Sequence, residues 1–134
     1  MESVSESELA HALRRYLAGH REHMLAVLEA LVRAESPTDV PEAQAEAQGM
    51  LARLLRTLGF RVRSLPAAEE ERGHLYARPK DRPRGRPVQL LVGHRDTVWA
   101  RGPLHDMPFD VEGNEVRGPR VLDMKAGLTP SLFA

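Results

Sequence analysis

An apolar run at residues 88–93 constrains the fold of this chain more than any other feature of its sequence. The run reads Val-Gln-Leu-Leu-Val-Gly, and His94, Arg95 and Asp96 follow it directly. Nearly continuous apolar segments of this length are typical of central strands that are covered on both faces. Ligand sites in α/β sheets gather at the carboxyl ends of such strands. The run therefore predicts a central strand that carries His94 and Asp96 to a functional edge.

The residues before this run predict two helical regions. Apolar side chains recur at helical spacing over residues 6–34, and Ser5 with Glu8 has the capping-box pattern. Gly19 is a candidate break within this region. A second apolar face spans residues 47–58 and ends at Gly59, which suits a helix C-terminus.

Shorter segments predict strands and a last helix. Residues 60–65 alternate with a period of two, and residues 74–78 form a second short strand pattern. Residues 109–112 and 115–117 predict a hairpin, and a helix is expected to begin near Lys125. This mixture of helices and strands predicts an α/β layer fold.

Composition excludes several classes of protein. The 134 residues carry 19 basic and 19 acidic side chains, so the net charge is zero, and there is no cysteine. Nucleic-acid and membrane-surface binding usually require a basic excess, and a metal site would need His, Asp or Glu instead of thiolates. The N-terminus lacks the pattern of a signal peptide, and no apolar run reaches membrane-spanning length. We expect a cytoplasmic protein with no nucleic-acid or membrane partner.

The residues after the apolar run favour a metal site. His94 and Asp96 would share one face of an extended segment, while Arg95 points away. Asp123 follows a short apolar run and precedes a helix start, and the intervening hairpin can return it beside the first pair. One histidine with two carboxylates suits a divalent cation.

Two other chemistries fit the sequence poorly. His94-Arg95-Asp96 looks like a kinase catalytic loop, but the Asn at catalytic-loop spacing, the Gly-rich loop and the strand lysine are missing. A serine hydrolase would need a G-x-S-x-G elbow, which the chain lacks. His105 and Asp106 lie in a Pro-flanked loop and are expected to be surface residues.

Two motifs together resemble a known family. GHRDTV followed by GPRVLDMKAG is similar to the co-catalytic zinc aminopeptidase and carboxypeptidase family. This family includes glutamate carboxypeptidases, acetylornithine deacetylase, succinyl-diaminopimelate desuccinylase and aminoacylases. Glu35-Ser36-Pro37 and Leu58-Gly59-Phe60 lie where the family has its "ES-P" turn and its helix-to-strand junction. The details look closest to the glutamate carboxypeptidase branch.

The resemblance implies roles for three residues. His94 would ligate one zinc ion and Asp123 would bridge two, with cobalt or manganese accepting the same ligands. Asp96 would be the catalytic-site carboxylate that orients His94, and a cis peptide bond would follow Asp123. The activity implied is hydrolysis of a peptide or N-acyl amino acid by a metal-bound hydroxide. The fold implied is the N-terminal part of a three-layer α/β/α catalytic domain spanning residues 1–134.

The chain also departs from the family pattern. Arg120 stands where the family usually has glycine, so its side chain is expected to disturb the backbone, and Pro130 falls where the last helix should be under way. The general base, the further ligands and the lid or dimerisation domain would all lie beyond Ala134, so a homodimer is expected only of the full-length family. The alternative function is therefore an inactive truncated fragment or a non-catalytic association module.

Overall fold

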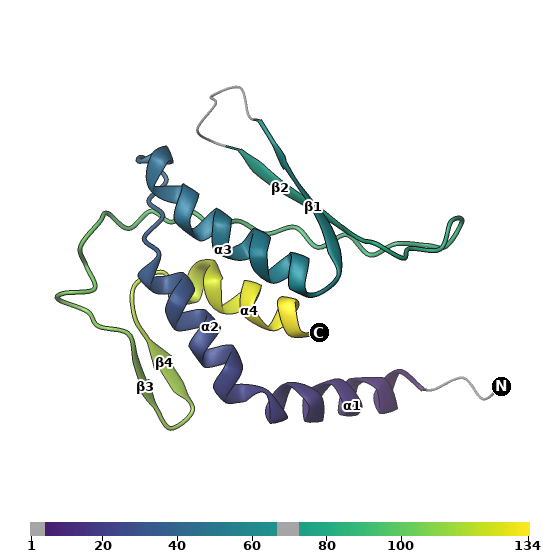
Figure 1. Cartoon of the computed structure of the whole chain (residues 1–134). Coiled ribbons are helices and arrows are strands. Elements are labelled where there is room, and N and C mark those ends of the chain that lie inside the picture. Colours follow the sequence, from purple (N-terminus) through teal and green to yellow (C-terminus); the bar gives the residue numbers. More distant parts are fainter. Residues whose placement is uncertain (1–4, 67–72) are drawn as a thin grey trace.

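The computed structural model describes residues 5–66 and 73–134 (Figure 1). Along the chain, helices come first, two short β-hairpins follow in succession, and a last helix comes after them. The elements are α1 (Glu6–Gly19), α2 (Arg21–Arg33), η1 (Pro41–Ala43), α3 (Gln44–Thr57), β1 (Phe60–Leu65), β2 (His74–Pro79), β3 (Asp110–Glu112), β4 (Glu115–Arg117), η2 (Val121–Lys125) and α4 (Ala126–Phe133).

The first predicted helical region forms two helices, which meet at His20. The capping box is confirmed, because the Ser5 hydroxyl accepts the N–H of Glu8 at 3.2 Å and the Glu8 carboxylate accepts the N–H of Ser5 at 2.9 Å. No residue of α1 is buried, so its apolar face lies open to solvent. Figure 1 shows α1 extending away from the other helices. Within the described part of the chain, no helix is long and apolar enough to cross a bilayer.

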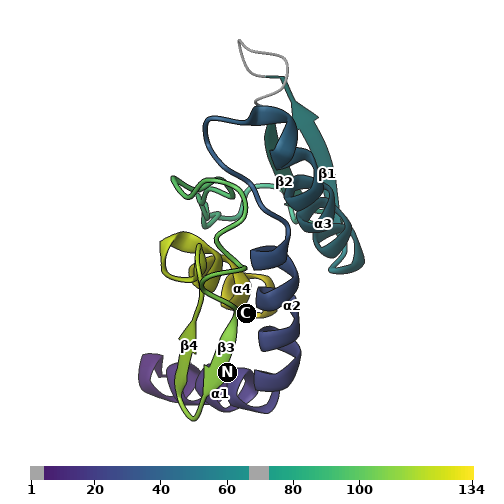
Figure 2. The ribbon, with the colours of Figure 1, turned by 90° about the vertical axis from the view of Figure 1, so that its left-hand side faces the viewer.

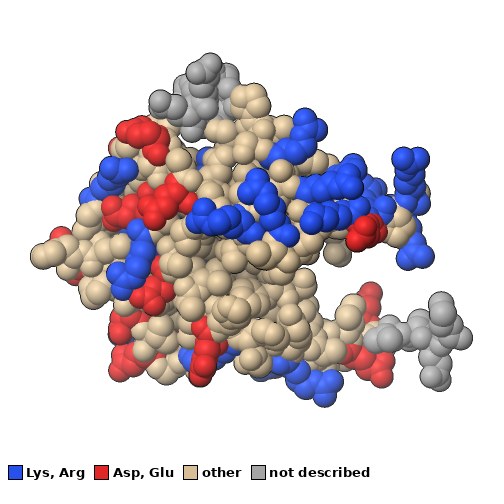
Figure 3. All heavy atoms as spheres, viewed as in Figure 1, with Lys and Arg blue, Asp and Glu red and all other residues tan. Residues whose placement is uncertain are grey.

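Helix α3 packs against the β1–β2 hairpin. Gly59 ends the helix with a φ of 84°, a value at which a side chain would be strained, and the predicted strand starts at the next residue. The strands pair antiparallel, with Phe60 opposite Pro79 and Leu65 opposite His74. Figure 3 shows that basic side chains gather over α3, this hairpin and the connector that follows it, so the neutral chain has an uneven charge distribution.

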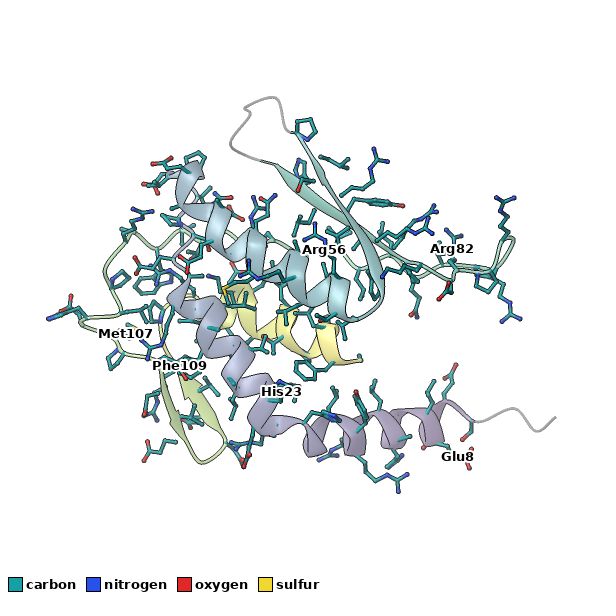
Figure 4. The ribbon with its side chains drawn as sticks, viewed as in Figure 1. Glu8, His23, Arg56, Arg82, Met107 and Phe109 are labelled. Carbon is teal, nitrogen blue, oxygen red and sulfur yellow. The ribbon has the colours of Figure 1, made fainter. Side chains whose placement is uncertain are left out.

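The core joins α2 to the second half of the chain. Leu28 and Val32 of α2 pack with Val121, and partly buried residues surround them. The β3–β4 hairpin forms as predicted, with Asp110 opposite Arg117. Figure 2 shows this hairpin, α2 and α4 close together, and Figure 4 shows Phe109 beside α2. The partly buried residues at this core are Leu104, Phe109, Val116 and Ala126.

The predicted central strand at residues 88–93 is wrong for the described structure. The segment has no strand partner among residues 5–66 and 73–134, and the exposed fractions of Leu90, Leu91 and Val92 are 79%, 76% and 81%. Strand pairing is non-local, and no described strand lies beside this segment to complete a ladder. The observed architecture is therefore a mixture of helices with two small antiparallel sheets, compatible with an α/β fold, in which the three-layer sandwich is not seen.

Candidate metal centre

His94 and Asp123 come together from distant parts of the chain. The Nε2 atom of His94 lies 3.0 Å from Oδ1 of Asp123, although 29 residues separate them. Their side chains are 46% and 82% exposed, so the pair opens to solvent. An imidazole nitrogen and a carboxylate oxygen that converge in this way are suitable donors for one divalent cation.

The second ring nitrogen of His94 is held by Asp96. Nδ1 lies 3.0 Å from the backbone carbonyl oxygen of Asp96 and 3.3 Å from its carboxylate Oδ1. Asp96 was predicted to orient the His94 ring, and it contacts the ring with its main chain as well as its side chain. Burial lowers the pKa of His94, but hydrogen bonds to Asp96 and Asp123 and their negative charges outweigh it and raise the pKa overall. A ring held on one nitrogen presents the other in a fixed direction, as ligating histidines do.

A turn at residues 36–38, in which Ser36 and Pro37 are buried, supports this segment. The Ser36 hydroxyl donates to the carbonyl of Arg95 at 2.6 Å, and the Thr38 hydroxyl donates to Oδ2 of Asp96 at 2.8 Å. The N–H of Thr97 donates to the Ser36 carbonyl at 2.9 Å, so main-chain pairing adds to these contacts. The sequence marked Ser36 within a motif but indicated no role for it, and Thr38 carried no signal.

Arg95 points away from the candidate site, as the alternation predicted. Its guanidinium donates to the carbonyl of Gly73, the residue directly before β2, at 2.9 Å. Burial lowers the pKa of the guanidinium, against a smaller opposite effect of Asp96. In the kinase-like tripeptide, Arg95 thus anchors the hairpin, His94 faces Asp123, and Asp96 holds the other side of the His94 ring.

The loop that carries Asp123 has an unusual backbone. The Asp123–Met124 peptide bond is cis, as the resemblance implied. The sulfur of Met124 accepts the N–H of His94 at 3.3 Å, which places the loop against the residues before the candidate ligand. Pro130 lies inside α4, which continues from Ala126 to Phe133.

Arg120 is accommodated in a strained backbone conformation. Arg120 adopts a left-handed backbone conformation with a φ of 71°, which costs a non-glycine residue roughly 1–2 kcal/mol. Its side chain is fully buried and forms an ion pair with Glu35, the Nη2 to Oε1 distance being 3.1 Å. The bulky side chain is accommodated because the interior supplies it with a counter-charge.

Gly93 allows His94 to lie close to α4. A Cβ atom at this position would stand 2.7 Å from Cδ2 of Leu128 and 3.2 Å from Cε of Met124. Both atoms end flexible side chains, so we expect Gly93→Ala to lower the free energy of unfolding by only about 1–2 kcal/mol. If His94 is a zinc ligand, displacing the backbone before it should weaken zinc binding by about tenfold.

Denaturant unfolding and zinc titration calorimetry would measure both effects of Gly93→Ala. The matched control is Gly19→Ala, where a Cβ atom would meet nothing within 4 Å. This control should raise the free energy of unfolding by about 0.5–1 kcal/mol and leave zinc affinity unchanged. Unaltered zinc affinity in Gly93→Ala would contradict the idea that the close packing of Gly93 against Leu128 and Met124 positions His94.

The donor set fits a metal ion in part. Zinc sites use three or four protein ligands, and His94 with Asp123 supplies two of suitable chemistry. Within residues 5–66 and 73–134, no group of three or more His, Asp or Glu side chains gathers as a metal site. His105 and Asp106 are 93% and 88% exposed and contact one another, so they are surface residues as predicted. The described residues thus bring together two donors of suitable chemistry, fewer than a zinc site uses.

Comparison with known proteins agrees with the motif evidence. No protein-family model matches the chain. The chain is 37% identical over 105 residues to "Carboxypeptidase G2" of Pseudomonas sp. (strain RS-16), and the match covers 78% of this chain and 25% of that protein. The chain is a partial homologue of a carboxypeptidase. It spans about a quarter of the length of this relative, at modest identity, and the relation supports a hydrolase family.

Proposed function

We propose that this chain provides part of the metal centre of a zinc-dependent hydrolase that cleaves a peptide or amide bond. The observation that carries the proposal is the convergence of His94 Nε2 and Asp123 Oδ1 at 3.0 Å in a chain similar to a carboxypeptidase. The proposed substrates are small peptides or N-acyl amino acids. Residues 1–134 would then belong to the catalytic domain of a larger α/β/α protein.

The proposal assigns a separate task to each residue. His94 and Asp123 would hold zinc, with cobalt or manganese as acceptable substitutes and with Asp123 bridging two ions in a complete site. The bound metal would polarise the scissile carbonyl and activate water. Asp96 orients the His94 ring through Nδ1 and is itself oriented by the Thr38 hydroxyl, so the imidazole keeps Nε2 directed at Asp123.

The first test is metal binding by ligand variants. We expect His94→Ala and Asp123→Asn each to weaken zinc binding by at least about 100-fold, because removal of a ligand should cost more than the 10–100-fold typical of an outer partner. Asp96→Asn should fall within that 10–100-fold range. Titration calorimetry measures these affinities, and His105→Ala with Asp106→Asn supplies a matched exposed His/Asp control.

Turnover distinguishes the catalytic proposal from its alternative. Hydrolysis of N-acyl amino acids by the zinc-loaded chain, lost in His94→Ala, would support a catalytic role. Zinc binding without turnover would favour a fragment that binds metal or a partner but does not catalyse. Equal zinc affinity of the wild type and both ligand variants would exclude this site as the metal centre.

A further inference from the structure

Arg120 joins three segments of the chain at one guanidinium group. Its Nη2 atom donates to Oε1 of Glu35 at 3.1 Å and to the carbonyl of Ala100 at 2.7 Å. The Glu35 carboxylate also accepts the N–H of Gly102, at 3.0 and 3.1 Å from its two oxygens. The segment after α2, the loop at residues 100–102 and the start of the Asp123 loop therefore meet here.

Each of these segments leads to a candidate site residue. Arg120 lies three residues before Asp123, and Ala100 lies four residues after Asp96. Glu35 is followed by Ser36, whose hydroxyl binds the carbonyl of Arg95. The Arg120–Glu35 pair is therefore connected by short stretches of chain to both halves of the site.

Arg120 and Asp123 differ in solvent exposure, which suits Arg120 to positioning and Asp123 to binding a ligand. The Arg120 side chain is 0% exposed, whereas that of Asp123 is 82% exposed. An exposed carboxylate with few contacts cannot fix its own position, so the backbone that carries it must be held elsewhere. Arg120 makes no hydrogen bond to His94 or Asp123, so its influence on them passes through the main chain.

The pair is poorly suited to a purely stabilising role. Nε and Nη1 of Arg120 are buried and have no hydrogen-bond partner among the described residues. Buried donors without acceptors oppose folding, and a buried ion pair is often no more stabilising than apolar residues of similar volume. The positive φ of Arg120 adds backbone strain. What the fork-shaped guanidinium supplies is a fixed geometry between two acceptors from different segments.

We propose that Arg120 is a positioning residue that, through its buried pair with Glu35, holds the His94 and Asp123 segments in their mutual arrangement. The functional meaning of this inference rests on the proposed metal centre. Arg120 thereby has a role that its position in a glycine-like backbone conformation does not by itself suggest.

The test uses the whole chain and two readouts. Variants Arg120→Gly and Glu35→Gln remove opposite sides of the pair, and glycine suits the backbone at residue 120. Glu29→Gln is the matched control, because Glu29 forms an ion pair with Arg33 at 2.7 Å, and this pair lies exposed on α2. Zinc affinity is measured by calorimetry, and amide hydrogen exchange at Thr97 and Gly102 is measured by NMR without metal.

We expect both variants to weaken zinc binding by about 10–100-fold, as losses of outer partners do. Exchange at Thr97 and Gly102 should become at least about tenfold faster, because their hydrogen bonds to Ser36 and Glu35 would open more often. Glu29→Gln should change neither readout. Arg120→Lys should recover only part of the zinc affinity, because an ammonium lacks the planar fork.

The outcomes are distinguishable. Altered unfolding with unchanged zinc affinity and unchanged exchange at Thr97 would show a structural role alone and overturn the inference. If the wild-type chain binds no zinc, the proposed function fails, and exchange at Thr97 still decides whether the pair orders this segment. If Arg120→Gly does not fold, Glu35→Gln preserves side-chain volume and carries both measurements.

Discussion

Lys125→Met should lower the free energy of unfolding by about 2–4 kcal/mol. Lys125 is 2% exposed, and its Nζ atom donates to the carbonyls of Leu31 and Ala34 at 2.6 and 2.9 Å. These carbonyls end α2, where the last turn has no partners of its own. Burial, aided by the charge of Arg120, lowers the pKa of Lys125 to about 8, so the ammonium is still mainly protonated at neutral pH.

Methionine fills a similar volume but donates nothing, so it would leave both buried acceptors without a partner. Denaturant unfolding monitored by circular dichroism would measure the loss. Lys80→Met is the matched control, because Lys80 is exposed and should change the free energy of unfolding by less than about 0.5 kcal/mol. Equal effects of the two substitutions would contradict a capping role for Lys125.

Leu28→Ala should lower the free energy of unfolding by about 3 kcal/mol, within the range for buried leucines. Leu28 is 5% exposed and packs with Val32 and Val121 in the core. The cost combines the lost transfer free energy of the removed methyl groups with the cavity left between α2 and η2. Because η2 includes Asp123, the substitution should also loosen the Asp123 loop.

The same unfolding measurement would test this prediction. Leu9→Ala is the control, since Leu9 lies on α1 and is 63% exposed. We expect the control to change the free energy of unfolding by no more than about 0.5 kcal/mol. Comparable losses at Leu28 and Leu9 would show that the core is not centred on α2.

Local sequence signals predicted much of the fold. Capping at Ser5, the turn residue Gly59, the two strand patterns at residues 60–65 and 74–78 and the hairpin at residues 109–117 depend on neighbours within a few residues, and each is present in the structure. The apolar run at residues 88–93 was misjudged because apolar character indicates a preference for burial without specifying a partner strand. Pairing between distant segments is a property of the whole chain, which periodicity does not encode.

The candidate site was predicted unevenly for the same reason. Alternation along the chain placed His94 and Asp96 together with Arg95 turned away, and the structure has this arrangement. The Arg120–Glu35 pair spans 85 residues and uses a backbone conformation that arginine disfavours. No local rule predicts such a pair, and the sequence suggested a steric conflict at Arg120.

The bridge between Pro37 and Thr97 has a consequence for how the site can fail. It is an isolated parallel bridge, and together with the contacts of Ser36 and Thr38 it sets the frame of residues 94–97 relative to the 36–38 turn. Successive side chains of an extended segment alternate between faces. If this segment slipped by one residue relative to the turn, Arg95 would take the place of His94 beside Asp123. A guanidinium in that place would repel a cation. Insertion of a single residue between Arg95 and Thr97 would therefore place a cation beside Asp123, whereas a substitution of His94 would only remove one donor.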